Sequence, residues 1–517
     1  MPHATPHRKD PTAPRSRSYQ GPYGRLFDEL DPWRPLDDAG EPITEDKALE
    51  KWCLNVANTL MIESVQPDGS PTLPRDVDET QMDAAFGSSI PAGYTYFGQF
   101  IDHDITFDPT SSLQRQSDPD KLANFRTPRL DLDNVYGRGP DDQPYLYDTD
   151  LPSTQAKFLI GAAIDGAPAP LHDLPRNTKG RALIGDPRND ENSIVSQLQL
   201  AFLHAHNTLV DRAQAHGITD AFTAARTTLR WLYQWVVWHD FVARIVDPDV
   251  HATALKSTIE HGRTVWKRGL TDVYDWHSQP YMPVEFSAAA YRFGHSMVRS
   301  KYKTNFHRGA SDADFVPIFD NSAGAGTDNL RGFRPVGLDN TIEWDWFLQM
   351  TSSVAGAGFP QRAHRIDTKL TNALAFLFEG PVAAPNNVLA SRNLLRGIRL
   401  ELPSGRDVAT KLGLTPIALD ADEPGSLWYY ILKEAETSAA GEHLGPVGSI
   451  IVAAVFAGLL DGDPMSWINV HPAWTPDTDP LLKPGIDNID SVDDPKAWGL
   501  PAIIRVAGVP TEAGQFR

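Results

Sequence analysis

Two neighbouring segments with strong helical periodicity constrain the fold of this 517-residue chain more than any other feature. Residues 192–216 and 220–245 repeat apolar side chains at intervals of three and four, and the second segment is rich in aromatic residues. No alternating run of convincing length predicts a strand. Weaker helical patterns occupy residues 48–63, 98–108, 283–302, 343–353, 388–400 and 427–437. The sequence therefore predicts one large, mostly α domain with long loops and little β structure.

The ends and connections of the chain differ in composition from the helical segments. Residues 1–25 are rich in Pro, Arg and Ser and predict a flexible tail, so residues 26–517 are expected to form the domain. Residues 75–90 are mostly polar and are expected to wrap the surface. Residues 109–182 carry many Pro, Gly and Asp residues, and long loops in compact domains are usually functional. Residues 447–460 are apolar but too short for a membrane span of roughly 18 residues, which predicts a buried helix.

Charge and cysteine content exclude several classes of function. The net charge of -20 disfavours a nucleic-acid partner and an anionic membrane surface, and it is compatible with a bound divalent cation. Cys53 is the only cysteine, so neither an intrachain disulfide nor a thiolate zinc site is expected. The first residues lack the apolar region of a secretory signal. We therefore expect the protein to stay in the cytoplasm or to leave by a route that reads no N-terminal signal.

The tripeptide Asp102-His103-Asp104 places a histidine between two carboxylates in an otherwise apolar and aromatic segment. Burying a carboxylate without a partner is costly, so an apolar frame around three titratable groups suggests a site. Imidazole titrates near neutral pH, and His103 could therefore act as an acid and a base. The alternative is a helix end at which the carboxylates cap free backbone N–H groups.

Two further motifs contain candidate site residues. Arg188 and Glu191 are three residues apart just before the first strong helix, where they can project to one side or serve only as capping groups. His295 lies among apolar and aromatic residues next to Gly294, and a glycine inside a helix suggests the close approach of something flat. A histidine that ligates a metal needs a partner on its other nitrogen, and Asn393 is a candidate.

A fourth motif offers oxygen ligands. Thr127, Arg129, Asp131 and Asp133 alternate, so in an extended chain they face the same way. A hydroxyl, a backbone carbonyl and two carboxylates suit Ca²⁺, although the spacing does not match an EF-hand loop. A polar edge strand is the alternative.

Together these motifs resemble the peroxidase–cyclooxygenase superfamily, the animal-type haem peroxidases. The resemblance covers roughly residues 75–467, and the motifs occur in the order of the family. The matching stretches are GQFIDHD at 98–104, RNDE at 188–191, HAHN at 204–207, RFGH at 292–295, NLLR at 393–396 and LGPVG at 444–448.

The resemblance implies a haem b cofactor held on its proximal side by His295. In this family the matching histidine is the axial iron ligand, and an asparagine matching Asn393 bonds its other nitrogen. Arg292 and Arg396 would pair with the haem propionates or orient the proximal side. Asp102 and Glu191 match positions that can form ester bonds to haem methyl groups, so covalently bound haem is possible. The next residue is Asn192, whereas some mammalian members have a methionine there that forms a sulfonium link.

On the distal side the resemblance implies reduction of hydrogen peroxide. His103 would take a proton from iron-bound peroxide and return it to the departing oxygen, Arg188 would stabilise the developing charge, and Gln99 would contact water or a halide. The product would be a ferryl haem that oxidises a small donor, either a halide, a pseudohalide or a phenol. Asp104 would join the residues of the fourth motif around Ca²⁺ and couple the ion to His103.

Two other classes remain open. Fatty-acid oxygenases of the same superfamily carry a radical-forming tyrosine three residues before the proximal histidine, where this chain has Arg292. Tyr291 is adjacent and is expected to point elsewhere on the helix. A haem-free structural or adhesion protein is the third class, which the intact His103, Arg188 and His295 disfavour.

Overall fold

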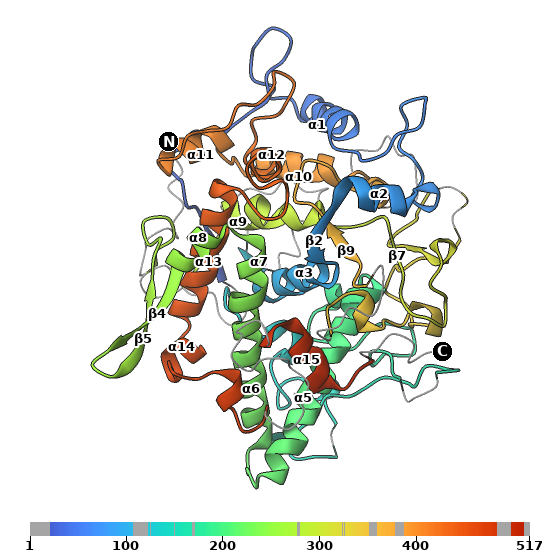
Figure 1. Cartoon of the computed structure of the whole chain (residues 1–517), viewed down its shortest axis with the longest axis vertical. Coiled ribbons are helices and arrows are strands. Elements are labelled where there is room, and N and C mark those ends of the chain that lie inside the picture. The colour runs from blue at the N-terminus through green and yellow to red at the C-terminus, as the bar shows by residue number, and fades with distance from the viewer. Residues whose placement is uncertain are drawn as a thin grey trace.

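The fold was analysed in a computed structural model of the chain. The structure describes residues 21–106, 123–124, 126–148, 150–167, 171–276, 280–322, 324, 326–350, 359–377, 387–482 and 498–510. These residues form a mostly α structure with small sheets and long connections, as predicted (Figure 1). Among them, no helix is both long and apolar enough to cross a membrane.

Two long helices, α5 (Ser193–Ala215) and α6 (Ala221–Val236), lie side by side and confirm the strongest prediction from the sequence (Figure 1). Asn192 caps α5, because its side chain accepts hydrogen bonds from the backbone N–H groups of Ile194 and Val195. Asp220 caps α6 in the same way. The predicted second helix then continues through a π-helical turn (Val237–Val242) into α7 (Ala243–Ile245). Such turns are frequent at functional sites.

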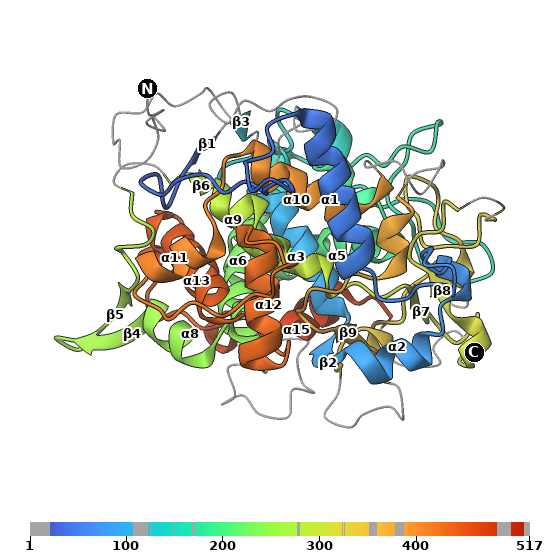
Figure 2. The same ribbon diagram turned by 90° about the horizontal axis from the view of Figure 1, so that it is seen from above.

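The helices α3 (Gly93–Ile105) and α13 (Pro446–Gly462) form much of the remaining core. The helix α3 packs against α5 and lies near the middle of the molecule in both views (Figures 1 and 2). The helix α13 is buried along almost its whole length, which confirms the predicted buried helix. The other helices are α1 (Asp46–Leu60), α2 (Glu79–Phe86), α4 (Asp133–Tyr136), α8 (Pro248–Ala254), α9 (Val284–Ala288), α10 (Leu389–Arg399), α11 (Gly405–Lys411), α12 (Leu427–Ala439), α14 (Trp467–Val470) and α15 (Leu500–Ala507).

The described strands are short and pair in small sheets. The hairpin of β4 (Leu255–Glu260) and β5 (Arg263–Arg268) projects from the helical body (Figure 2). His261 and Gly262 both have positive φ at its turn, as two-residue hairpin loops require. The other pairs are β1 (Gly21–Gly24) with β3 (Ala123–Asn124) and with β6 (Met282–Pro283), β2 (Gly87–Pro91) with β9 (Arg362–His364), and β7 (Lys301–Tyr302) with β8 (Val316–Pro317).

Three segments differ from the prediction. The helix expected over residues 283–302 consists of α9 followed by a 3₁₀ segment, Ala290–His295, because the backbone of Ala289 leaves the helical region. In the region 343–353 the described residues form a single 3₁₀ turn, and residues 351–358 lie outside the described residues. Residues 75–90 lie largely at the surface, as expected, although they contain α2 and most of β2. Strand β1 lies within the predicted tail, of which residues 1–20 lie outside the described residues.

Candidate functional site

A cavity of about 430 Å³ lies where α3, α10, the 3₁₀ segment Ala290–His295 and the residues before α5 meet. This volume is in the range of small-molecule and cofactor sites. Most of the residues predicted for catalysis and cofactor binding line the cavity, although they come from distant parts of the sequence. They are Gln99, Asp102, His103, Glu191, Arg292, His295, Asn393 and Arg396.

His103 is buried near the end of α3, and its ring is held by an amide chain. Its Nδ1 lies 2.7 Å from Oδ1 of Asn189, whose Nδ2 donates to Oε1 of Gln199 at 2.7 Å. Because Asn189 presents an acceptor, Nδ1 carries the proton and Nε2 is left as the acceptor of the ring. Burial and the nearby Arg188 lower the pKa of His103 to about 4. The imidazole is therefore neutral near pH 7 and can accept a proton.

Arg188 lies behind His103 and is not among the described residues that line the cavity. Its guanidinium group donates to the Asp186 carboxylate at 2.8 Å and to the backbone carbonyls of His103 and Thr106 at 3.1 and 2.6 Å. Burial alone would raise the pKa of Asp186, but Arg188 and Arg126 hold it below its usual range. Arg188 thus fixes the backbone that carries the histidine and adds positive charge beside the ring.

Gln99 and the two carboxyl groups of the cavity wall are also held by hydrogen bonds. Gln99 donates to Glu191 at 2.6 Å and accepts from Asn192 at 3.2 Å. Asp102 accepts from the Thr106 hydroxyl at 2.9 Å. Burial raises the pKa of Glu191, because nearby opposite charge offsets only part of the cost of desolvation. The cavity therefore has two carboxyl groups in fixed positions.

His295 is the second histidine of the cavity and comes from the 3₁₀ segment. The amide nitrogen Nδ2 of Asn393 lies 2.7 Å from its Nδ1, so the predicted contact between the two side chains is present. An imidazole that ligates a metal through Nε2 carries its proton on Nδ1 and donates that proton to an acceptor. Half a turn of the Asn393 amide brings its oxygen to Nδ1 as this acceptor. Burial and Arg292 lower the pKa of His295 to about 3. The ring is therefore neutral, as a metal ligand must be.

Guanidinium groups gather beside His295. Burial and Arg396 lower the pKa of Arg292 to about 9, and burial and Arg396 lower the pKa of Arg392 to about 10. The Nε atom of Arg292 is buried without a hydrogen-bond partner. Gly294 faces open space, since a Cβ atom there would meet no atom within 4 Å. A neutral histidine, an open face beside it and a cluster of cations fit a flat cofactor with negatively charged groups.

The sequence reasoning expected Tyr291 to point away from the site, and the structure corrects this. Tyr291 lines the cavity, and its hydroxyl donates to the Gly98 carbonyl at 3.2 Å. The Tyr291 ring is held there by packing against Phe286, Phe293 and Phe456, a tertiary arrangement that position along a helix does not report.

Asp104, Asp131 and Asp133 meet below the end of α3, with carboxylate oxygens within 4.8 Å of one another. Burial and Asp131 raise the pKa of Asp104 to about 8, and burial also raises those of Asp131 and Asp133. One oxygen of Asp104 and both oxygens of Asp133 are buried without hydrogen-bond partners. Clustered carboxylates with several oxygens that accept no hydrogen bond fit a divalent cation such as Ca²⁺.

The residues beside these carboxylates fit the predicted calcium set in part. The Thr127 hydroxyl donates to Asp131 at 2.9 Å, so it belongs to the cluster, and the Leu132 N–H bonds Asp104 at 3.2 Å. Arg126 contributes one positive charge through contacts with Asp133 at 3.3 Å and with Asp186. Among the described residues, no hydrogen bond joins the Arg129 carbonyl to the cluster, and the Arg129 side chain is half-buried.

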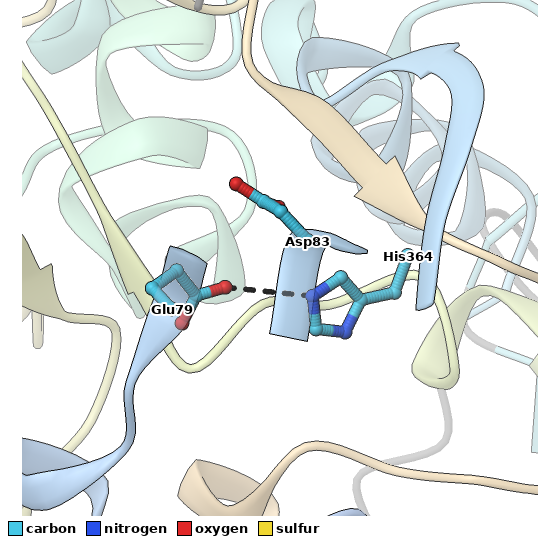
Figure 3. Close-up of side chains that lie close together, drawn as sticks. All are labelled: Glu79, Asp83 and His364. Atoms are coloured by element: carbon cyan, nitrogen blue, oxygen red, sulfur yellow. Dashed lines mark ion pairs between the residues drawn. The ribbon is translucent and has the colours of Figure 1, made fainter. Parts of the chain in front are cut away.

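A second group of acidic residues and a histidine, Glu79, Asp83 and His364, lies outside the cavity (Figure 3). His364 contacts Glu63 at 2.7 Å through Nδ1 and Glu79 at 3.4 Å through Nε2. The Arg299 guanidinium contacts the same oxygens that a metal would need, at 3.2 Å from Glu79 and 2.8 Å from Asp83. Burial opposes the charged imidazole, but the two glutamates raise the pKa of His364 to about 10. The group is therefore a buried ion network.

The sequence reasoning missed Asn189, Gln199, Arg331 and Arg392. Asn189 lies inside the recognised motif next to Arg188, but nothing local shows that its amide meets a histidine 86 residues away. Arg392 directly precedes Asn393, and this position beside a predicted site residue could have indicated a role for it. Arg331 lies in no recognised motif.

Known proteins resemble part of this chain in sequence. Thyroid peroxidase from Homo sapiens is 26% identical over 202 residues, which are 35% of this chain and 20% of that protein. Thyroid peroxidase from Canis lupus familiaris is 28% identical over 204 residues, again 35% and 20%. The chain thus aligns with about a fifth of the length of these relatives.

Solved structures share the fold over almost the whole chain. Peroxidase A from Dictyostelium discoideum matches with a TM-score of 0.55 and 15% identity, covering 97% of this chain and 99% of that one. A fatty acid alpha-dioxygenase from Oryza sativa matches with a TM-score of 0.54 and 15% identity, covering 98% and 85%. At these identities the likeness concerns the fold. The family model described as animal haem peroxidase matches residues 110–417, which is more than half of the chain. This chain therefore belongs to the animal haem peroxidase family.

Proposed function

We propose that the protein is a haem peroxidase that reduces hydrogen peroxide and oxidises small donors. One observation carries the proposal: His103 and His295 line the same cavity, and an asparagine amide contacts Nδ1 of each at 2.7 Å. When the Asn393 amide turns its oxygen toward Nδ1 of His295, both Nε2 atoms are available, one for iron and one for peroxide. Haem, when bound, supplies the iron that accepts an oxygen atom from peroxide and withdraws electrons from the donor.

In this proposal His103 moves the proton. Its neutral ring takes a proton from peroxide at Nε2 and returns it to the departing oxygen, while Asn189 holds Nδ1. Arg188 holds the backbone of His103 and adds positive charge near the site of O–O cleavage. Gln99, held by Glu191 and Asn192, presents a fixed amide to water or to a small donor.

The proximal residues bind and orient the cofactor. His295 would ligate the iron with Asn393 as its neutral partner, and Arg292, Arg392 and Arg396 would hold the propionates. A neutral amide makes the imidazole less anionic than a carboxylate partner would, which favours an oxidising iron. Asp102 and Glu191 both line the cavity, so ester links to the haem remain part of the proposal.

Calcium belongs to the proposal because Asp104 directly follows His103. An ion held by Asp104, Asp131 and Asp133, with Thr127 and the Arg129 carbonyl, would offset three buried negative charges. It would also fix the last turn of α3, so the positions of the ion and of His103 would be coupled.

A fatty-acid oxygenase is the second candidate, favoured by Tyr291 on the cavity wall and by the shared fold. Against it, Arg292 occupies the position three residues before His295. Oxygen uptake with palmitate, compared between the natural protein and Tyr291→Phe, separates the two functions. Uptake that the variant loses would support the oxygenase, and the absence of uptake in a peroxide-reactive protein would support the peroxidase.

The test of the proposed function is an optical spectrum of the purified, haem-supplemented protein before and after hydrogen peroxide. A Soret band that shifts on peroxide addition and returns with a donor is expected. No Soret band, or one indifferent to peroxide, would refute the proposal. Extraction with acidified acetone then tests the ester bonds. Haem that stays with the chain would support them, and haem that is extracted would exclude them.

A further inference from the structure

The loop at residues 330–334 forms one wall of the cavity mouth. Arg331 and Phe333 both line the cavity, and both are exposed to solvent; Phe333 keeps 45% of its surface exposed. The Arg181 guanidinium lies 5.8 Å from the centre of the Phe333 ring, and the exposed remainder of the ring is available to a ligand that enters the cavity.

The loop is held firmly against the segment that carries Glu191. Ser193 N–H donates to the Leu330 carbonyl at 2.8 Å, Gly332 N–H to the Glu191 carbonyl at 2.9 Å, and Phe333 N–H to the Asp190 carbonyl at 2.7 Å. A Cβ atom on Gly332 would lie 1.8 Å from the Asp190 oxygen, so only glycine permits this approach. The two side chains are therefore presented from a fixed backbone.

Phe333 adopts a backbone conformation that bulky residues avoid. Its φ is +57°, in the left-handed region that favours glycine. Such strain persists only where the surrounding structure enforces it, and it gathers at ligand sites. The three hydrogen bonds of the loop provide that enforcement, and the result is a phenyl ring directed to the opening.

Arg331 provides a positive charge beside that ring. Its Nη1 donates to Oδ1 of Asn321 at 3.1 Å, and the Asn321 amide is itself anchored on the carbonyls of Phe376 and Leu377. Among the described residues, no carboxylate forms an ion pair with Arg331. Burial and Arg331 lower the pKa of Arg334, and Asp328 offsets part of this shift, so Arg331 and Arg334 lie close enough to repel each other.

The remaining wall of the mouth is apolar and includes Phe319, Leu377 and Leu389. A guanidinium group binds a carboxylate through two parallel hydrogen bonds, and an exposed ring packs on another ring. The protein as a whole carries a net charge of -20, which repels anions, so an anionic donor needs a local cation to reach the cavity.

We propose that Arg331 and Phe333 recognise aromatic carboxylates, and that the donors of this enzyme belong to that class. The inference rests on the proposed function, because the donor is oxidised in the same cavity. A halide would need no apolar ring, and a cationic donor would meet Arg331 and Arg392 at the mouth.

Three phenols that differ only in their side chain test the proposal. They are 4-hydroxyphenylacetate, 4-ethylphenol and tyramine, which are anionic, neutral and cationic. Binding to the haem-loaded resting protein is measured without peroxide, by the change of the Soret band and by ligand-observed NMR. The variants are Arg331→Gln and Phe333→Gly, where glycine accepts the positive φ. Arg334→Gln is the matched control, since it removes a charge from the same loop outside the cavity.

The natural protein is expected to bind 4-hydroxyphenylacetate at least about tenfold more tightly than tyramine. Arg331→Gln should weaken the binding of 4-hydroxyphenylacetate about tenfold and leave the binding of 4-ethylphenol unchanged. Phe333→Gly should weaken the binding of all three phenols. Arg334→Gln should change the affinity for 4-hydroxyphenylacetate by less than about threefold. Equal affinity for the three phenols, or an equal loss for all of them in Arg331→Gln, would overturn the inference. A Soret band that responds to peroxide in a protein without charge preference would leave the proposed function standing. A protein without a Soret band would refute that function, and the NMR binding would still test Arg331.

Discussion

Replacing Asn189 with aspartate tests whether the amide chain behind His103 sets the protonation of the distal ring. The change keeps the shape of the side chain and puts a negative charge 2.7 Å from Nδ1. The buried Nε2 atom of Gln199 has no hydrogen-bond partner, so half a turn of this amide can donate to the new carboxylate. The variant therefore changes charge with little change in packing.

The expected shift follows from Coulomb's law. Two unit charges 2.7 Å apart in a medium of effective dielectric constant about 20 attract by about 6 kcal/mol, which corresponds to about 4 pKa units. Desolvation of the new carboxylate and the nearby Arg188 offset part of this, so we expect a rise of at least about 2 units. The pKa of His103 would move from about 4 to 6 or higher. At pH 5 the fraction of neutral ring would fall roughly tenfold.

The assay is the rate of the Soret change on rapid mixing with hydrogen peroxide between pH 4 and pH 8. A protonated ring cannot act as the base, so the rate of the natural protein should fall only as the pH approaches 4. In Asn189→Asp the same fall should occur near pH 6 or above, with similar rates at pH 8. Asn189→Ala is the control, because it removes the orientation without adding charge and should slow the reaction at every pH. If the rate of Asn189→Asp fell at the same pH as the rate of the natural protein, the proposed effect of Asn189 on the pKa of His103 would be refuted.

Three further predictions concern the proximal ligand, the carboxylate cluster and the ion network. His295→Ala should lose the Soret band or bind haem at least about tenfold more weakly, measured by haem titration, and full retention of the natural spectrum would exclude it as the iron ligand. Asp131→Asn should lower calcium content, measured by atomic emission, and slow the reaction with peroxide; stoichiometric calcium would exclude this site. His364→Gln should destabilise the fold by about 3 kcal/mol near pH 6, because it leaves Glu63 without its buried partner and leaves Glu79 paired with Arg299 alone. The folded-state pKa of His364 is raised to about 10, so its contribution is full below about pH 6.5 and is lost as the pH rises to about 10. Urea unfolding should therefore show the two proteins converging in alkali, and a constant difference would contradict the charged histidine.

Local pattern was sufficient for the long helices because their stability comes from one apolar stripe that repeats with the helical period. The segments that became α1, α5, α6, α10 and α12 were predicted in this way, whereas α13 was predicted from a continuous apolar run. The same reasoning failed at residues 283–302, where a turn at Ala289 breaks the helix. It also missed the hairpin of β4 and β5, whose half-exposed strands lack a clear alternation of apolar and polar residues.

The sequence by itself determined the mostly α class and the candidate residues, since motifs retain their order and composition whatever the packing. Only the tertiary structure decided which of them meet. It brought His103, Glu191, His295 and Asn393 to one cavity, placed Arg188 behind the wall, and added Asn189 as the partner of the distal ring. Hydrogen bonds and charge act over a few ångströms in space, and separation along the chain does not report that distance. For the same reason Arg331 and Phe333, which belong to no motif, became visible only when the loop was seen against the cavity.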